Sequence, residues 1–413
     1  MEHISLSDRQ ILRARAQKQL EYATSPRNDE IIKQWEALAQ GRRDTPTVRL
    51  LYSNFVDEVV LPRLQCQGET ARRLEHTLLC TLVGRELFDD DTPIAPTFDI
   101  SWNTQVKLFG ISPERTHAAT NGAKGFHIDP VIEDMEADLE KFKGGDFTVN
   151  RQGTLEWRAL AEDVFGDILP TRMVTPSLVG SITNPLVMLT GMETLYLALY
   201  DCPEAFHTVM ELAARVHEAY YDYLEKEQLL FPTHGISPVC QESFAFNHEL
   251  PTENVTKTTQ CWGFLECQEF TAASPEQYGE FIYPYLDRMA QRYGLLSYGC
   301  CERVDNLWVD YLSKWKHLRK LSVSPFNDEN QIGEYLRGSN IVYYSKPRAE
   351  YVTNPGPLDE DALRRYFKGV CQASSGCILE MAQREVGTIF GDFERGKRYV
   401  QIARECIADY WKP

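Results

Sequence analysis

Reactive and polar side chains follow several apolar segments in the second half of the chain, each at the point where a strand would end. The densest group is the run YGCCE, in which two adjacent cysteines and a glutamate follow an apolar stretch. A thiolate and carboxylates close together suit zinc, which accepts sulfur and oxygen ligands and keeps an open coordination position when it is catalytic. The candidate site residues are Glu266, Gln268, Tyr298, Cys300, Cys301, Glu302, Asp328 and Lys346.

The spacing within YGCCE leaves the metal assignment open. In a strand, alternate side chains point to opposite faces, so Tyr298, Cys300 and Glu302 share one face and Cys301 faces the other way. Both cysteines would reach one site only if the strand bulges at its end. We expect Cys300 or Cys301 to supply sulfur to a metal, and the alternative is that one cysteine packs against helices while Glu302 pairs with a basic residue.

Strands and helices alternate regularly from about residue 261 to the end of the chain, with a helix expected over 307–318 among them. Such alternation predicts parallel strands joined by right-handed crossovers. We therefore predict an α/β fold, a TIM-like (β/α)8 barrel over residues 46–413, preceded by an N-terminal helical extension over residues 1–45. A charged helix is expected over 130–142. The alternative is an open doubly wound sheet, which the absence of GxGxxG and GxxxxGK[ST] turns disfavours.

A barrel places catalytic groups at the carboxyl ends of its strands, where the candidate residues are expected. Lys346 at such an end could stabilise charge or bind an anionic part of a substrate.

Charge and composition narrow the classes of partner. The chain has 43 basic and 60 acidic residues, a net charge of −17, and no block of basic residues that could follow a phosphate backbone, so we expect no nucleic acid partner. The sequence shows neither a signal-peptide core nor an apolar run of about 18 residues, so a cytoplasmic protein without a membrane span is expected. Eleven cysteines without dense spacing indicate reduced thiols.

Four motifs occur in a fixed order: ECQEFTAASPEQYGEF, YGCCE, LRKLSVSPFND and YSKP. On these motifs the chain resembles the uroporphyrinogen decarboxylase superfamily, and more closely a branch of decarboxylase-like proteins related to corrinoid-dependent methyltransferases. The resemblance implies a β/α barrel with its site at the open end and one of two chemistries. The decarboxylases use no cofactor and bind a tetra-acidic substrate through an arginine-rich motif that is absent here. The methyltransferases bind zinc and move a methyl group to or from the cobalt of a separate corrinoid protein.

The zinc ligands of that family cannot all be carried over to this sequence. Tyr298 stands where a histidine ligand would fall, and Cys300 stands where the first cysteine would. A later cysteine has no match, because Cys377 begins its strand and the strand end carries Gln383 and Arg384. We expect Glu266, from the preceding strand, to replace a missing zinc ligand.

The resemblance implies a zinc-assisted methyltransferase that moves a methyl group between a small methylated compound, such as a methoxylated aromatic, and a corrinoid protein. In this hypothesis zinc polarises the departing heteroatom, Glu302 or Tyr298 handles its proton, and Lys346 holds an anionic part of the substrate. Gln268 and Asp328 would contact the substrate. Cobalamin would arrive only with the separate protein, since the chain has no DxHxxG motif.

The sequence leaves two alternative functions open, and it also suggests an oligomeric state. The first alternative is a cofactor-independent decarboxylase or lyase acting on another acidic substrate. The second is a barrel that has lost activity and serves as a binding or assembly subunit. A homodimer is also expected, because barrels of this superfamily are often dimers.

Overall fold

Seven parallel strands form the central sheet of the protein. The computed structural model describes residues 4–44, 46–117 and 126–413 of the chain. Neighbouring strands pair in parallel throughout the sheet, which confirms the predicted α/β class. In order across the sheet the strands are β1 (Thr47–Leu50), β15 (Ile378–Gln383), β14 (Val342–Ser345), β13 (Leu318–Val323), β12 (Leu295–Tyr298), β11 (Trp262–Leu265) and β8 (Leu178–Val179).

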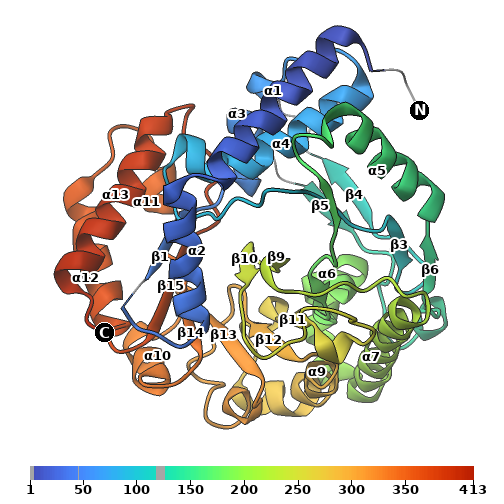
Figure 1. Cartoon of the computed structure of the whole chain (residues 1–413). Coiled ribbons are helices and arrows are strands. Elements are labelled where there is room, and N and C mark those ends of the chain that lie inside the picture. Colours follow the sequence, from blue (N-terminus) through green and yellow to red (C-terminus); the bar gives the residue numbers. More distant parts are fainter. Residues whose placement is uncertain (1–3, 45, 118–125) are drawn as a thin grey trace.

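The sheet is curved and TIM-like, but hydrogen bonds do not close it into a ring within the described residues. Its two edges are β1 and β8, and β2 pairs with β7 in a separate two-stranded sheet. Helices cover the outer face of the curve (Figure 1), whereas a doubly wound sheet carries helices on both faces. The other strands are β2 (Phe98–Ile100), β3 (Thr104–Lys107), β4 (Glu114–His117), β5 (Phe126–Asp129), β6 (Asp146–Val149), β7 (Thr171–Met173), β9 (Gly235–Val239) and β10 (Ser243–Ala245).

Helices follow the strands of the second half, in the part of the chain where the sequence predicts that strands and helices alternate. Ser274 accepts the backbone N–H of Gln277 at 3.2 Å, and the Gln277 side chain accepts the N–H of Ser274 at 3.0 Å, so a capping box starts this helix. The longer helices are α1 (Leu6–Ala23), α2 (Pro26–Ala39), α4 (Glu69–Leu87), α5 (Arg151–Phe165), α6 (Thr183–Asp201), α7 (Pro203–Lys226), α9 (Tyr283–Ala290), α10 (Glu329–Leu336), α12 (Glu360–Ala373) and α13 (Phe393–Tyr410). The short ones are α3 (Val56–Val59), α8 (Pro275–Gln277), α11 (Glu350–Thr353), a π-helical turn (Tyr278–Ile282) and the 3₁₀ helices η1 (Ser53–Phe55), η2 (Leu61–Arg63), η3 (Leu139–Lys141), η4 (Thr258–Gln260), η5 (Gln268–Phe270) and η7 (Leu312–Lys314).

The predicted helix over 130–142 is wrong, because side chains compete for its backbone. Asp134 accepts the N–H of Ala137 at 2.8 Å, and Asp138 accepts the N–H of Glu133 at 3.1 Å. These carboxylates replace helical hydrogen bonds with turns.

The predicted helix over 307–318 is also wrong. Just before this segment Asn327 accepts the N–H groups of Val304 and Asp305, at 2.6 and 3.2 Å. These two bonds tie the segment to the loop that follows β13. Only the short helix η7 forms within it.

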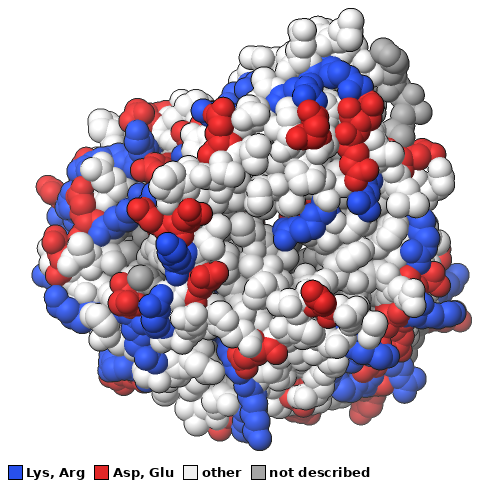
Figure 2. Space-filling view, in the orientation of Figure 1, with Lys and Arg blue, Asp and Glu red and all other residues white. Residues whose placement is uncertain are grey.

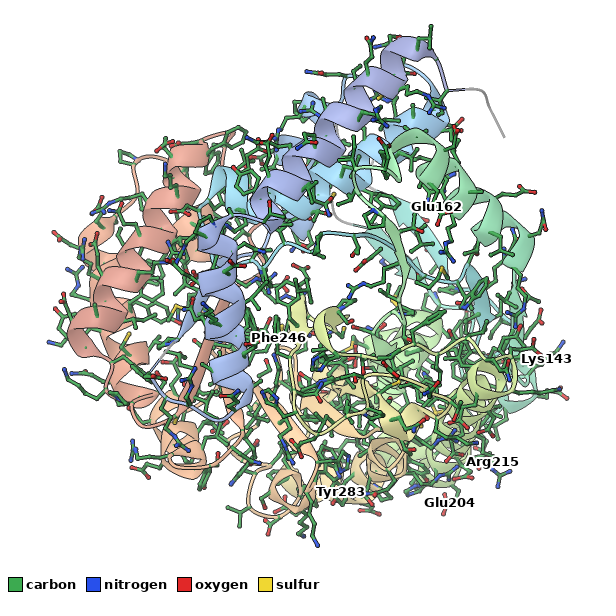
Figure 3. The ribbon with its side chains drawn as sticks, viewed as in Figure 1. Lys143, Glu162, Glu204, Arg215, Phe246 and Tyr283 are labelled. Atoms are coloured by element: carbon green, nitrogen blue, oxygen red, sulfur yellow. The ribbon has the colours of Figure 1, made fainter. Side chains whose placement is uncertain are left out.

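A β-hairpin, β9–β10, lies on the inner side of the curved sheet (Figure 1). Tyr344 of β14 donates its hydroxyl to the carbonyl of Gln241 at the hairpin tip, at 2.6 Å. On the other side of the hairpin, Trp35 of α2 stacks on Phe246 with ring centroids 5.9 Å apart, and Figure 3 shows Phe246 beside α2. The hairpin therefore lies within the space that the strands enclose.

A buried ion pair ties the hairpin to the sheet. Lys320 of β13 donates to Glu380 of β15 at 2.8 Å, and both side chains are buried. Ser243 of the hairpin donates to Glu380 at 2.7 Å and also bonds Lys320. Burial lowers the pKa of Lys320, and the charge of Glu380 opposes that shift. The pair is stable only while each charge keeps its partner.

The two N-terminal helices predicted from the sequence are present. Helix α1 contacts α4 and α5, while α2 lies over the hairpin (Figure 1). Charged side chains such as Lys143, Glu162, Glu204 and Arg215 lie at the outer surface (Figure 3). Figure 2 shows charged groups mainly around the rim of this face and mostly uncharged side chains at its hollowed centre, with a basic group beside the hollow. None of the described helices is both long and apolar enough to cross a membrane.

Candidate active site

A cavity of about 740 Å³ lies at the carboxyl ends of the strands. The ends of β11, β12 and β15, the hairpin tip and the segment before α6 line it. The predicted site residues in its lining are Glu266, Gln268, Cys300 and Cys301. A smaller adjoining cavity of about 190 Å³ shares the two cysteines and adds Lys346. The structure thus brings five of the eight candidate residues to one place.

Gly299 explains how both cysteines reach the cavities. Its φ of 98° lies in the left-handed region that favours glycine, and it breaks the strand alternation directly after Tyr298. A Cβ at this position would lie 3.1 Å from Cβ of Ser322. Cys300 and Cys301 line both cavities, and their sulfur atoms are 3.6 Å apart. The strand end therefore bulges, as the arrangement of both thiols at one site requires.

The two thiols differ in acidity. The contact with Cys300 and the nearby ammonium of Lys346 lower the pKa of the Cys301 thiol, against the opposing effect of its burial. The same contact, together with burial, raises the pKa of Cys300. Cys301 is therefore the better nucleophile of the pair.

Alkylation tests this difference in acidity. We expect iodoacetamide at neutral pH to modify Cys301 faster than Cys300, because the thiolate is the reacting form. Peptide mass spectrometry over a time course measures the order of labelling. The variant Lys346→Met removes the stabilising cation and is expected to slow the labelling of Cys301. Faster labelling of Cys300 in the unsubstituted protein would contradict the assignment.

Lys346 is a buried cation beside the cysteines. Its ammonium group donates to the carbonyl oxygens of Gly299 and Cys300, at 3.4 and 3.3 Å. Burial lowers the pKa of Lys346 to about 8, while the nearby Cys300 and Glu302 act in the opposite direction. The side chain therefore titrates within the working range of most enzymes and can bind an anion while it is protonated.

Glu266 is one of three acidic residues that line the larger cavity, together with Glu242 and Glu385. It is buried, and its Oε2 accepts the backbone N–H of Gln268 at 2.8 Å. Burial first, and then the negative charges of Glu302 and Glu269, raise the pKa of Glu266 well above its usual range. The carboxyl group is held toward its neutral form, in which it can donate a proton.

Glu302, expected from the sequence to handle the proton of the substrate, is not among the residues that line the two cavities. It is buried, and its carboxylate accepts the N–H groups of Cys267 and Cys300, at 2.9 and 2.7 Å. Burial raises its pKa, and these two hydrogen bonds oppose the rise. The residue joins the ends of β11 and β12, so we assign it a positioning role.

Tyr298 and Asp328 lie away from the two cavities. Tyr298 points toward the outer helices, where its hydroxyl lies 3.1 Å from that of Tyr278 and 3.3 Å from the sulfur of Cys267. Asp328 is exposed and caps α10 by accepting the N–H of Gln331 at 3.0 Å. The catalytic role expected for Tyr298 and the substrate contact expected for Asp328 are not retained. In a strand end that bulges at Gly299, Tyr298 stays on the outer face.

Three further residues line the larger cavity with buried polar atoms that lack a hydrogen-bond partner within the described part of the chain. They are the hydroxyl of Ser181, the amide oxygen of Gln241 and one Nη of Arg384. An unsatisfied buried polar group costs about 1–3 kcal/mol, so a ligand that completes these bonds is favoured. Arg384 also lines the smaller cavity, which places a second cation near Lys346.

His217 of α7 also lines the cavity. Its Nδ1 lies 2.8 Å from the carbonyl oxygen of Ala213, which assigns the proton to this nitrogen. Burial lowers the pKa of His217 to about 4, so the ring is neutral near pH 7 and its Nε2 is an acceptor. His217 lies on the buried face of an amphipathic helix, and this helical periodicity can be read from the sequence, so the burial of His217 could have been predicted.

The predicted zinc ligands Glu266, Cys300 and Cys301 are not arranged around a common point where a zinc ion could bind. Within residues 4–44, 46–117 and 126–413, no group of three or more His, Cys, Asp and Glu side chains is placed to hold a metal ion. Glu266 and Glu302 accept backbone N–H groups, and Lys346 places a positive charge beside the thiols. The zinc prediction stays a prediction, and no step proposed below passes through zinc.

Comparison with solved structures gives a likeness of fold. No family model matches the chain, and no curated protein matches it in sequence. Among solved structures, a methyltransferase from Methanosarcina mazei superposes with a TM-score of 0.52 and 13% sequence identity. The match covers 91% of this chain and 98% of that chain. At this identity the likeness establishes a shared fold, and membership of the uroporphyrinogen decarboxylase superfamily stays a prediction.

Proposed function

We propose that the protein is a methyltransferase that takes a methyl group from a small anionic compound, such as a methoxylated aromatic acid, and passes it to a corrinoid protein. The observation that carries the proposal is the placement of an acid, Glu266, in one cavity system with two cations, Lys346 and Arg384. This combination matches a substrate with a carboxylate at one end and a departing oxygen at the other. The shared fold with a methyltransferase agrees with it.

The cations and the unsatisfied polar groups bind and orient the substrate. One Nη of Arg384 lacks a partner and the other lies 3.6 Å from Oε1 of the half-exposed Glu385, so the planar guanidinium can hold a substrate carboxylate through two hydrogen bonds only by exchanging that contact. Lys346 adds a second positive charge from the adjoining cavity. Ser181 and Gln241 offer a hydroxyl and an amide oxygen to the rest of the molecule.

Glu266 supplies the proton that the departing oxygen needs. The corrinoid partner would supply cobalt(I) as the nucleophile that takes the methyl group. As the bond between the methyl carbon and the oxygen breaks, its electron pair stays on the oxygen. Glu266 donates its proton to that oxygen, which leaves a hydroxyl product and an ionised Glu266. A later proton from solvent restores the acid.

The binding of anionic substrates is expected to weaken above about pH 8. Lys346, whose pKa is about 8, carries its charge below that pH and loses it above. The dissociation constant should therefore rise as pH increases from 7 to 10, and Lys346→Met should remove most of this dependence. Isothermal titration with a methoxybenzoate across the pH range measures it. A dissociation constant that does not change between pH 7 and 10 would contradict this role.

A decarboxylase is the second candidate, because the same groups suit it. Loss of carbon dioxide breaks a carbon–carbon bond and leaves its electron pair on carbon, where Glu266 could deliver a proton. The cations would hold another carboxylate of the substrate. The raised pKa of Glu266 favours this reading as much as methyl transfer.

Turnover of a defined probe tests the proposal. The purified protein is mixed with cob(I)alamin and a panel of methoxybenzoates, and methyl transfer is followed by absorbance. We expect transfer by the unsubstituted protein, a strong loss in Arg384→Met, and retention in Arg319→Met. Arg319 pairs with Glu249 at 2.7 Å and lies outside both cavities, so it is a matched control. Equal rates in the two variants would count against the site.

A further inference from the structure

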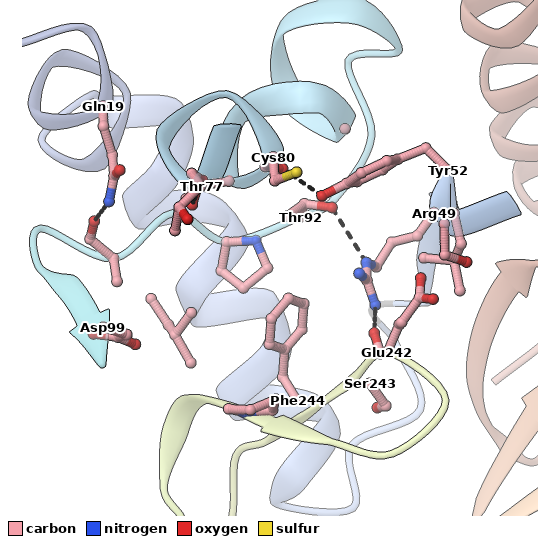
Figure 4. Close-up of a pocket in the computed structure, with 18 of the residues that line it drawn as sticks. Gln19, Arg49, Tyr52, Thr77, Cys80, Thr92, Asp99, Glu242, Ser243 and Phe244 are labelled. Atoms are coloured by element: carbon pink, nitrogen blue, oxygen red, sulfur yellow. Dashed lines mark hydrogen bonds between the residues drawn. The ribbon is translucent and has the colours of Figure 1, made fainter. Parts of the chain in front are cut away.

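A third cavity, of about 400 Å³, lies where the sheet does not close. Its walls are β1, α4, the segment from Thr92 to Asp99 and one side of the β9–β10 hairpin (Figure 4). It shares only Pro238 and Glu242 of the hairpin with the cavity of about 740 Å³ at the carboxyl ends of the strands, which we call the mouth cavity. Its volume lies within the range of small-molecule sites. None of the steps proposed for methyl transfer uses it.

Gln19 of α1 presents an unsatisfied acceptor at this cavity. The side chain is only 2% exposed, and its amide nitrogen donates to the carbonyls of Ala95 and Thr97, at 2.9 and 3.0 Å. Both carbonyls require a donor, which fixes the orientation of the amide. Its oxygen is buried and has no hydrogen-bond partner among the described residues. A ligand that carries an N–H or O–H group would satisfy it.

Arg49 of β1 presents a buried cation at the same cavity. It is 6% exposed, its Nε donates to Thr92 at 3.2 Å and one Nη donates to the carbonyl of Glu242. Its guanidinium lies 4.5 Å from the ring centroid of Phe244. The buried carboxylate of Asp90 acts on Arg49 through its charge, but no ion pair of 4 Å or less joins Arg49 to a carboxylate of the described residues. A buried charge without a close counterion is costly, and a ligand carboxylate would supply one.

The other charged residues of the lining indicate which charge the second end of the ligand carries. Asp99 lies on the same side as Gln19 in Figure 4, and it is paired with Nε of Arg172 at 2.9 Å. Glu242 lies near Arg49 in the same view. The lining therefore holds one cation, Arg49, and two carboxylates, Asp99 and Glu242, so a ligand with charges of both signs complements it better than a simple anion does.

We propose that this cavity is a second ligand site for a small amino carboxylate. The carboxylate binds Arg49, the amino group donates to the amide oxygen of Gln19 near Asp99, and the carbon chain lies against Phe244 and its apolar neighbours. The site is independent of the proposed methyl transfer, so either can fail alone.

Titration calorimetry with a series of probes tests the site. The probes are glycine, β-alanine, 4-aminobutyrate and 5-aminovalerate, with the carboxylic acids and amines of matching length. We expect at least one amino carboxylate to bind more tightly than its matched acid and amine. Arg49→Met should weaken that binding by about tenfold or more, since a hydrogen bond to a charged group is lost. Arg319→Met should leave it unchanged.

Two outcomes would overturn the site. One is the absence of binding by every probe at millimolar concentration, and the other is binding that Arg384→Met abolishes and Arg49→Met does not, which would place the ligand in the mouth cavity. If Arg49→Met does not fold, Thr77→Phe serves instead, because Thr77 is an exposed residue of the cavity lining and a larger side chain there obstructs it. Unchanged binding in a folded Thr77→Phe protein would equally count against the site.

Discussion

The substitution Glu266→Gln is expected to slow methyl transfer by about 10²- to 10⁴-fold, the usual contribution of general acid catalysis. Glutamine has the same shape and can still accept the N–H of Gln268, which lies 2.8 Å from Oε2. It cannot donate the proton that the departing oxygen needs. The rate of a single turnover with cob(I)alamin and a methoxybenzoate measures the effect.

The acidity of the departing group provides the control for this experiment. Electron-withdrawing substituents on the aromatic ring make the departing phenol more acidic, so it needs less help from an acid. The ratio of the unsubstituted rate to the Glu266→Gln rate should therefore shrink along such a series. A constant ratio would show that Glu266 positions the substrate and does not donate the proton.

The substitution Lys320→Met is expected to lower the free energy of unfolding by about 3–5 kcal/mol, because it leaves a buried charge without its partner. Glu380 is fully buried and would keep only the hydroxyl of Ser243 as a donor. The loss of this ion pair would also weaken the attachment of the β9–β10 hairpin to the sheet. Urea unfolding followed by tryptophan fluorescence measures the change.

A double variant separates the lost charge from lost packing. Lys320→Met with Glu380→Leu removes both charges and keeps the volume apolar, so most of the stability should return. Ser243 would lose its acceptor in this variant, which prevents complete recovery. A loss below about 1 kcal/mol in the single variant, or no recovery in the double one, would contradict the role of the pair.

The sequence predicts the second half of the fold well because its signals are local. Strand runs such as Val342–Ser345 are short and apolar, and the box of Ser274 and Gln277 marks a helix start. The two helices predicted wrongly, over 130–142 and 307–318, do not form because side chains, some of them distant in sequence, hydrogen-bond to the backbone in or beside these segments. Asn327 reaches back to the backbone of the 304–305 segment, and no local pattern contains that contact.

The site is predicted in part for a similar reason. The motif order places Glu266, the two cysteines and Lys346 at one edge of the sheet, and the structure brings them to two adjoining cavities. The positive φ at Gly299 breaks the alternation after Tyr298, so Tyr298 and Cys300 do not share a face, and the alternation rule alone does not include this break.

The hairpin tip escapes sequence analysis for a different reason. Gln241 and Glu242 both adopt positive φ, of 63° and 65°, without the glycine or asparagine that usually marks such a turn. The contribution of Gln241 to the cavity therefore has no local signal in the sequence.

One labelling experiment tests the central claim that the mouth cavity carries out methyl transfer. A methoxybenzoate labelled with ¹³C at both the methyl and the carboxyl carbon is incubated with the protein and cob(I)alamin, and the products are followed by ¹³C NMR. The account predicts that the methyl label moves to cobalt while the carboxyl label stays on the ring, and that Arg384→Met suppresses the transfer. Release of the carboxyl label as carbon dioxide with the methyl group retained would contradict it and favour the decarboxylase.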